Sequence, residues 1–247
     1  MRAIILAAGR GSRLGEIGNQ RPKCLVELVG KPLIERQIAA LRGGGVEAVG
    51  VVRGYRADMI DFPDLTYFHN SRWSETNMVV SLTAAAEWLA ASPVIVSYAD
   101  IFYRRELVRG LAGAPGDLVI AYDRAWRALW SRRFADPLAD AETFRADESG
   151  RLMEIGNKTS NIEEIEGQYM GLLKFTPRAW EEIEALLTGL DPQLRDRLDM
   201  TGLLRRLLSR GFSITTYATD GQWGEIDNSR DLALYERMVD AGELRLE

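Results

Sequence analysis

The sequence predicts one α/β domain, 1–247, in which a mostly parallel central sheet is flanked by helices, and three observations lead to this prediction. The chain has 247 residues, of which 46% are hydrophobic, and this is enough to bury the core of a single domain. Several strand-length runs, beginning with AIILAA at 3–8, lack a polar face, which is typical of strands inside a parallel sheet. Segments with helical periodicity alternate with these runs and favour right-handed crossover connections.

The first half of the chain alternates strands and helices. A first helix is expected over 33–41, because its apolar residues recur at helical spacing and three glycines, 43–45, follow it. A second helix begins near Met78, with Asn77 as a suitable N-cap residue. Apolar runs predict strands at 3–8, 46–52, 66–69, 93–100 and 118–122.

Residues 123–165 differ from the rest of the chain. Aromatic and charged residues mix there without an amphipathic stripe, and two short strands, 143–146 and 152–155, are expected to form a hairpin that turns at Ser149-Gly150. We interpret 123–165 as a small specificity lobe inserted in the domain. Beyond it, the pattern predicts strands at 168–175 and 213–218 and helices at 178–187, 200–210 and 229–241.

A glycine-containing loop follows the first strand and is a candidate phosphate-binding site. Gly9 and Gly11 lack a Cβ, so the backbone N–H groups there can turn toward an anion. Arg13 and Lys23 add cationic side chains, and ligands of parallel sheets bind at this edge, where the strands end. An ordinary strand-to-helix turn would explain the glycines but not the cations.

The loop departs from the two commonest phosphate-binding motifs. The dinucleotide fingerprint requires G-x-G-x-x-G, whereas the third glycine here, Gly15, comes one residue late. No acidic residue ends a second strand about 20 residues on, where the sequence reads Arg21-Pro22-Lys23. The Gly-Lys-Ser/Thr of a P-loop is also absent. These differences argue against an NAD(P)-dependent oxidoreductase and a P-loop enzyme.

Composition restricts the classes of partner. A formal net charge of −5 argues against a surface adapted to nucleic acid or anionic membranes. Cys24 is the only cysteine, which excludes an intrachain disulfide and a cysteine-based zinc site. No apolar run approaches the length of a membrane span and no signal peptide is apparent, so we expect a cytoplasmic protein.

The motif L-A-A-G-x-G-x-R at 6–13, followed by Arg21-Pro22-Lys23, resembles the signature of nucleotidyltransferases that join a nucleoside triphosphate to a phosphorylated small molecule. The resemblance implies a Rossmann-like sheet of the nucleotide-diphospho-sugar transferase type. It also implies that Arg13 holds the triphosphate and that Lys23 stabilises the α-phosphate during transfer. The remaining triphosphate-binding residues would be Leu6, Ala7, Ala8, Gly9 and Gly11.

Two aspartates that follow expected strands are candidate Mg²⁺ ligands. Asp100 ends the strand 93–100, and Asp227 lies in a segment, 225–228, similar to the one that carries the family's second metal ligand. Carboxylate oxygens suit Mg²⁺. The resemblance implies that both share one Mg²⁺ bridging the α- and β-phosphates; alternatively, Asp227 only belongs to the cap of the last helix.

Three residues are candidates for nucleobase binding. Tyr55 follows the strand 46–52 and can pack on a base or simply cover the sheet. The segment from Asn77 to Ser81 resembles one that lies beside the base in the family, where an amide and a hydroxyl can read a pyrimidine. Helix capping and a place on the helix surface are the alternative roles.

Within residues 122–174, the pair Trp126 and Trp130, the segment Asp140-Ala-Glu142 and the segment Gly167-Gln-Tyr169-Met-Gly carry a further resemblance. They resemble the small cytidylyltransferases of surface-polysaccharide and phosphonate pathways, which use CTP and activate phosphocholine, 2-aminoethylphosphonate or phosphorylated glutamine. Tryptophan rings and carboxylates can surround an ammonium group, and a lysine can meet the acceptor's phosphate. The candidate acceptor-binding residues are Trp126, Trp130, Glu142, Lys158 and Tyr169. The alternative is that the two tryptophans, at i and i+4, form one buried helix face.

The chemistry implied by the resemblance requires no general base. The second pKa of a phosphate monoester is about 6, so the attacking oxygen is already an anion at neutral pH. This agrees with a chain whose only histidine is His69. A sugar-1-phosphate uridylyl- or thymidylyltransferase and a nucleotide-binding regulatory subunit are the competing functions.

Overall fold

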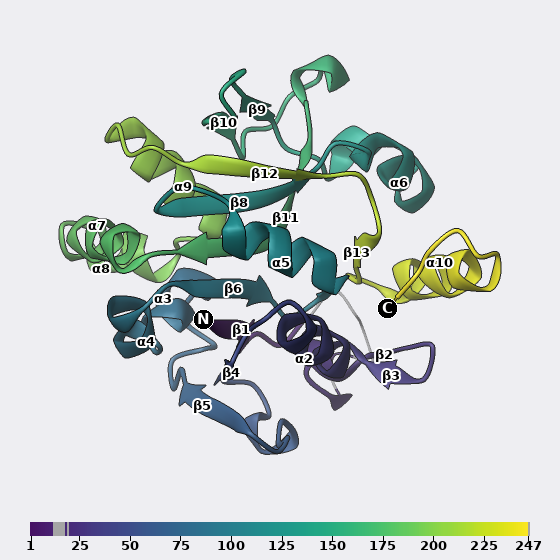
Figure 1. The fold of residues 1–247 in the computed structure, drawn as a ribbon, viewed down its shortest axis with the longest axis horizontal. Helices are drawn as coiled ribbons and strands as arrows, with labels where there is room; N and C mark the ends of the chain where they lie inside the picture. The colour runs from purple at the N-terminus through teal and green to yellow at the C-terminus, as the bar shows by residue number, and fades with distance from the viewer. Residues whose placement is uncertain (12–17, 19, 247) are drawn as a thin grey trace.

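The structure, a computed structural model that describes residues 1–11, 18 and 20–246, has a central seven-stranded sheet with helices on both faces (Figure 1). The strand order is β12-β8-β11-β6-β1-β4-β5. Neighbouring strands are parallel except at β11, which is antiparallel to both β6 and β8. The strands are β1 (Arg2–Ala7), β4 (Ala48–Arg53), β5 (Leu65–His69), β6 (Val94–Tyr98), β8 (Leu118–Asp123), β11 (Gln168–Phe175) and β12 (Thr215–Thr219). The predicted fold class is confirmed.

The two faces of the sheet are buried under different helices. Along β1, Ile4 and Leu6 belong to one core cluster, whereas Ala3 and Ile5 belong to a second, because successive strand residues point to opposite faces. The first cluster is covered by α3 (Met78–Thr83), α4 (Ala86–Ala91), α7 (Pro177–Thr188) and α9 (Met200–Ser209). The second is covered by α2 (Leu33–Gly43), α5 (Arg105–Gly113) and α6 (Trp126–Arg133).

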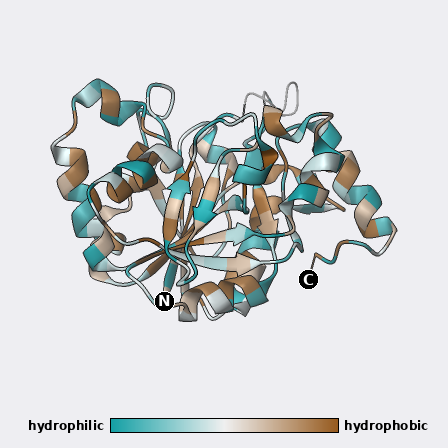
Figure 2. Cartoon of the chain, turned by 90° about the horizontal axis from the view of Figure 1, so that it is seen from above, coloured by the Kyte–Doolittle hydropathy of each residue, from teal (hydrophilic) through white to brown (hydrophobic). Residues whose placement is uncertain are grey.

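The amphipathic pattern of these helices is visible in Figure 2, where hydrophobic and hydrophilic residues alternate along the helices on both sides of the sheet. The single helix expected from Met78 is divided into α3 and α4. Two further helices are α8 (Pro192–Asp196) and α10 (Ser229–Asp240). In the described part of the chain, none of the helices has the length and hydropathy needed to cross a bilayer.

The segment 123–165 contains α6 and the predicted hairpin. Strands β9 (Phe144–Ala146) and β10 (Leu152–Ile155) pair in antiparallel fashion. Phe144 and Leu152 are buried in the first core cluster, and β10 contacts α9, so the hairpin belongs to the core on that face of the sheet. Whether 123–165 acts as a specificity lobe stays a prediction.

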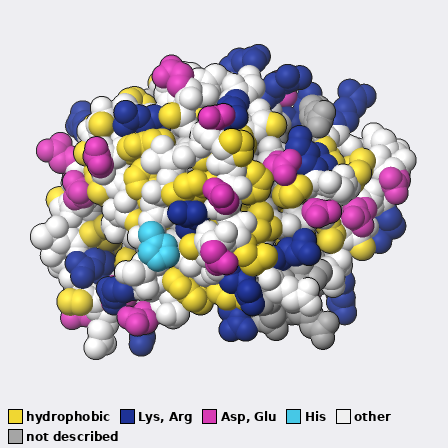
Figure 3. Space-filling model, turned by 90° about the horizontal axis from the view of Figure 1, so that it is seen from below, with side chains coloured by type: hydrophobic (Ala, Val, Ile, Leu, Met, Phe, Trp, Pro, Cys, Tyr) yellow, Lys and Arg dark blue, Asp and Glu magenta, His cyan; other side chains and the backbone are white. Residues whose placement is uncertain are grey.

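Two further ribbons lie outside the main sheet. One joins β2 (Glu27–Leu28) to β3 (Lys31–Pro32), and the other joins β7 (Ile101–Tyr103) to β13 (Trp223–Glu225). The second ribbon matters for function, because it brings the chain after β6 next to the segment before α10. On the face drawn in Figure 3, basic and acidic side chains lie mixed among one another.

Candidate active site

A cavity of about 300 Å³ lies where β1 and β6 end. The register of the sheet places Leu6 of β1 beside Tyr98 of β6, so both strands end at one edge. The residues around the cavity are Leu6, Ala7, Ala8, Gly9, Gly11, Lys23, Cys24, Trp73, Thr76, Asn77, Met78, Ser81, Tyr98, Ala99 and Asp100. Most of the residues predicted for nucleotide binding therefore surround one space, together with Lys23 and Asp100.

The glycine loop contacts the predicted catalytic lysine. Gly11 has a φ of 69°, a conformation that favours glycine, and a Cβ on it would lie 3.1 Å from Cβ of Lys23. The loop backbone can approach the lysine side chain closely because this Cβ is missing. Arg13 lies outside the described residues, so its role in holding the triphosphate stays a prediction.

Lys23 joins the two predicted metal ligands. Its Nζ donates hydrogen bonds to Asp100 Oδ2 at 2.6 Å and to Asp227 Oδ1 at 2.7 Å. Burial alone would lower the pKa of Lys23, but attraction from Asp100 and Asp227 outweighs burial and raises it. The ammonium therefore stays charged between two carboxylates that are distant in sequence.

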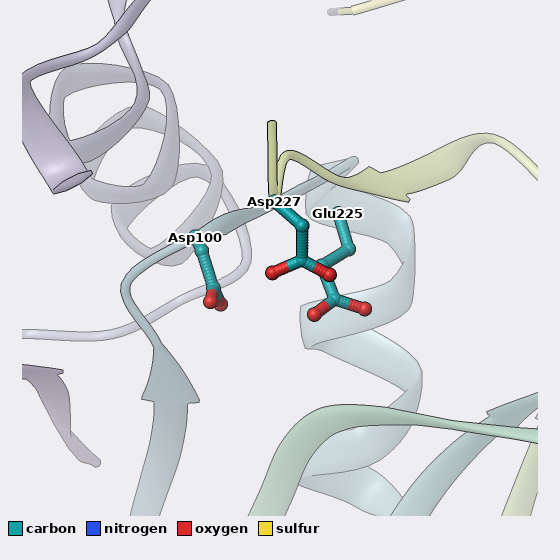
Figure 4. A group of neighbouring side chains, drawn as sticks. All are labelled: Asp100, Glu225 and Asp227. Carbon is teal, nitrogen blue, oxygen red and sulfur yellow. The ribbon is translucent and has the colours of Figure 1, made fainter. Parts of the chain in front are cut away.

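Glu225 joins the aspartates to form a group of three carboxylates. Single oxygens of Asp100, Glu225 and Asp227 lie within 4.8 Å of one another, and Figure 4 shows Asp100 on one segment beside Glu225 and Asp227 on another. The ribbon of β7 and β13 causes this, because Glu225 pairs with Ile101 and the backbone N–H of Ile226 donates to Asp100 O at 2.9 Å. An all-oxygen donor set of this kind fits a hard divalent cation such as Mg²⁺.

The electrostatics of Glu225 also indicate that a cation would be stabilised here. Burial, followed by repulsion from Asp100 and Asp227, raises the pKa of Glu225 to about 8. A divalent cation near these oxygens would favour the ionised form and reverse this effect. Glu225 was not predicted as a ligand, although Glu225 and Asp227 are two residues apart in an extended segment and so can face the same side.

The sequence interpretation also missed a buried arginine beside the carboxylates. Arg133, the last residue of α6, has no exposed side-chain surface, and its Nη2 lies 3.3 Å from Asp227 Oδ2. In the sequence, Arg133 belongs to a run of mixed charges in which nothing marks it as buried.

Two of the predicted base-binding residues line the cavity, although each also has a structural contact. Asn77 caps α3, accepting a hydrogen bond from the N–H of Met78 at 2.7 Å. Ser81 is buried, and its hydroxyl accepts a hydrogen bond from Asn70 Nδ2 at 3.0 Å. Capping accounts for the position of Asn77 and leaves its role toward a base a prediction.

Tyr55 is separated from the cavity by a tryptophan. The ring of Trp73, which lines the cavity, packs edge-on against Tyr55 with 5.3 Å between ring centroids. Gly54 makes this approach possible, because a Cβ there would lie 2.6 Å from Trp73 Cβ. Trp73 and Tyr98 line the cavity itself, and the role of Tyr55 toward a base stays a prediction.

The predicted acceptor role of Trp126 and Trp130 needs correction. Both side chains are buried in the second core cluster, and their Nε1 atoms donate to Ile165 O at 3.3 Å and Asp140 Oδ2 at 3.1 Å. The rings lie on one face of α6 that packs into the core, with Trp130 tilted against Trp223. This is the buried helix face expected in the alternative interpretation, and it leaves no ring face open to an ammonium group.

The other acceptor candidates lie outside the cavity lining. Lys158 Nζ donates to Asp140 O at 2.8 Å. Burial raises the pKa of Glu142, and attraction from Lys158 opposes the shift. Tyr169 packs edge-on against Tyr98 with 5.9 Å between centroids, so it contacts a cavity residue from behind. Their roles toward an acceptor stay predictions.

Comparison with known proteins gives a match over most of the chain. The family model of the MobA-like NTP transferase domain matches residues 3–187. A CTP:phosphoglutamine cytidylyltransferase from Campylobacter jejuni is 37% identical over 248 residues, which cover 94% of this chain and 98% of that protein.

Two solved structures share the fold. A putative glucose-1-phosphate thymidylyltransferase from Bacillus anthracis superimposes with a TM-score of 0.77 and 16% identity, covering 96% of this chain and 94% of that one. A CTP:phosphocholine cytidylyltransferase from Streptococcus pneumoniae gives a TM-score of 0.73 and 20% identity, covering 96% and 98%. At these identities the two structures support the fold alone, which is the one that the glycine motif predicted.

Proposed function

Because the chain belongs to the MobA-like NTP transferase domain family and is a nucleotidyltransferase, we propose that it transfers a CMP group from CTP to a small phosphorylated or phosphonate acceptor and releases pyrophosphate. The observation that carries this proposal is the convergence of Lys23, Asp100 and Asp227 beside a cavity rimmed by the glycine loop. The similarity to a CTP:phosphoglutamine cytidylyltransferase over 94% of the chain supports CTP as donor and makes phosphoglutamine the first acceptor to test.

The reaction requires many negative charges to be neutralised. A nucleoside triphosphate brings about four of them, and catalysis depends on positioning and electrostatic stabilisation. Asp100 and Asp227, with Glu225 beside them, would hold Mg²⁺, which supplies positive charge for the α- and β-phosphates. Lys23 lines the cavity and contacts Asp100, so its ammonium group is the side-chain cation that we assign to the α-phosphate.

The acceptor would act without a general base. Its phosphate or phosphonate oxygen is already anionic at neutral pH, since its second pKa is about 6. The contribution of the chain is to hold two anions in line and screen their repulsion. Phosphocholine and 2-aminoethylphosphonate are the other members of the acceptor class, and surface-polysaccharide or phosphonate biosynthesis in the cytoplasm is the setting that we propose.

The experiment that tests this function is a matrix of substrates. The protein is incubated with each of CTP, UTP, dTTP and ATP, combined with phosphoglutamine, phosphocholine, 2-aminoethylphosphonate or glucose 1-phosphate, and pyrophosphate release is followed. We expect release with CTP and one of the first three acceptors. Release only with UTP or dTTP and glucose 1-phosphate would replace our proposal by a sugar-phosphate nucleotidyltransferase, and binding of CTP without turnover of any acceptor would favour a regulatory subunit.

A further inference from the structure

Arg133 connects the 123–165 segment to the carboxylates of the site. It is the last residue of α6, and its side chain has 0% exposed surface. The guanidinium donates to both oxygens of Asp231, through Nε at 3.0 Å and Nη2 at 3.1 Å. The same Nη2 lies 3.3 Å from Asp227 Oδ2, and Nη1 lies 3.7 Å from Glu225 Oε2. One buried cation therefore contacts three carboxylates.

These contacts divide the two oxygens of Asp227 between two cations. Oδ1 accepts from Lys23 on the cavity side, and Oδ2 accepts from Arg133 on the other side. Asp231 adds to this arrangement, because its Oδ2 accepts from the backbone N–H of Asp227 at 2.9 Å. Arg133 and Asp231 thus fix both the carboxylate and the backbone of Asp227. Hydrogen bonds of this kind orient metal-binding groups in many proteins.

The position of Arg133 itself depends on α6. Its guanidinium lies over the ring of Trp130, 4.8 Å from the centroid, and 5.0 Å from the centroid of Phe134. Trp130 is fully buried. A shift of α6 would therefore carry Arg133 with it and disturb Asp227.

We infer that Arg133 is a positioning residue, which acts through Asp227 and Glu225 by holding their carboxylates in place beside the cation that binds the triphosphate. This inference rests on the proposed function. It gives the buried face of α6 a role: the helix sets the orientation of the metal-binding carboxylates. A purely structural interpretation is that Arg133 and Asp231 only fasten α6 to α10.

The two interpretations predict different effects on cation binding. Removal of a positive charge close to the carboxylates would by itself tighten binding of a divalent cation. Loss of orientation would weaken it, by about tenfold or more for groups that hold a metal ligand in place. The sign of the change therefore separates positioning from simple electrostatics.

The test uses the full chain and Mn²⁺ as a probe, with free Mn²⁺ followed by electron paramagnetic resonance in the presence of CTP. The variant is Arg133→Met, and the matched control is Arg132→Met. Arg132 is the preceding residue of α6, is 41% exposed and pairs with Glu243, so its loss removes the same charge without touching the carboxylates. Arg133→Lys keeps the charge but cannot make the two-pronged contact with Asp231.

We expect Arg133→Met to raise the Kd of Mn²⁺ in the CTP complex about tenfold or more and to lower kcat more than it raises the KM of CTP. Arg133→Lys should recover only part of this loss, and Arg132→Met should match the wild type. Unchanged or tighter Mn²⁺ binding by Arg133→Met, or equal effects of the two methionine variants, would overturn the inference.

A second variant addresses folding. Arg133→Met leaves the buried Asp231 without its cation, which destabilises the folded state. The double variant Arg133→Met/Asp231→Asn removes this uncompensated charge. It should show the same loss of Mn²⁺ affinity. If the wild type binds Mn²⁺ together with CTP and the double variant binds it equally well, the positioning role of Arg133 is refuted and the proposed function is not. Wild-type protein that binds no Mn²⁺ with CTP refutes both the inference and the proposed function.

Discussion

Replacement of Lys23 by methionine separates the two roles that the structure gives to this side chain. The ammonium is both the counter-ion of Asp100 and Asp227 and the group that we assign to the α-phosphate. Methionine keeps a similar unbranched stem but removes the charge. The variant should therefore lose activity and, in the absence of divalent cation, lose stability.

The expected magnitudes follow from the burial of the contacts. Loss of one charged donor to a developing oxyanion costs about a hundredfold or more in kcat, which is about 2.7 kcal/mol. Loss of one partner from a buried ion pair costs about 3–5 kcal/mol. The Lys23 and Asp100 side chains are 10% and 18% exposed, which places the expected loss of stability near the lower end, about 3 kcal/mol.

Divalent cation should restore most of that stability. Mg²⁺ at about a hundred times its Kd contributes about 2.7 kcal/mol to a folded state that binds it, close to the expected loss. The assays are pyrophosphate release and thermal unfolding with and without Mg²⁺, and Lys31→Met, outside the cavity lining, is the control. A near-wild-type rate in Lys23→Met would show that Lys23 does not stabilise the transition state. If Mg²⁺ does not restore the stability of this variant, the carboxylates do not bind the cation.

Three other predictions concern single residues of the site. The folded-state pKa of Glu225 is about 8, above its usual 4.5. Its contribution to the free energy of unfolding is therefore complete below about pH 4.5 and is lost as pH rises to about 8. Urea unfolding in EDTA should show that the free energy of unfolding falls over this pH range, and Glu225→Gln should reduce this dependence on pH. Gly11→Ala places a methyl group 3.1 Å from Lys23 Cβ at a positive φ, so we expect about 1–2 kcal/mol of strain and a raised KM for CTP. An unchanged KM would count against the close approach of the glycine loop to Lys23. Burial raises the pKa of Cys24 to about 12, so alkylation by iodoacetamide at pH 8 should require unfolding, and rapid labelling of the native protein would contradict this.

The local parts of the fold and site were predictable because short stretches of sequence determine them. Unbroken apolar runs predicted the inner strands, and the motif that contains Gly9, Gly11 and Lys23 predicted that these residues lie around one site at the edge of the sheet. Asp100 was predictable because a strand leads directly to it. In each case, the position of the residue follows from elements adjacent to it in the chain.

The remaining features depend on contacts between distant segments. Glu225 reaches Asp100 because β7 pairs with β13, and Arg133 reaches Asp227 because α6 packs beside α10. The spacing of Glu225 and Asp227 relates these two residues to each other, but no local pattern encodes either tertiary contact. The i, i+4 spacing of Trp126 and Trp130 fits an aromatic cage as well as a buried helix face, and only tertiary packing decides between them. Trp73, which lines the cavity in front of Tyr55, was likewise not marked by any pattern in the sequence.

The most direct test of the central claim is a crystal structure with Mg²⁺ and a non-hydrolysable analogue of CTP. We predict that the cation lies between Asp100 and Asp227, and that Lys23 Nζ lies within hydrogen-bond distance of the α-phosphate. A triphosphate bound away from the glycine loop, or a cation held by other residues, would contradict the mechanism proposed for this protein.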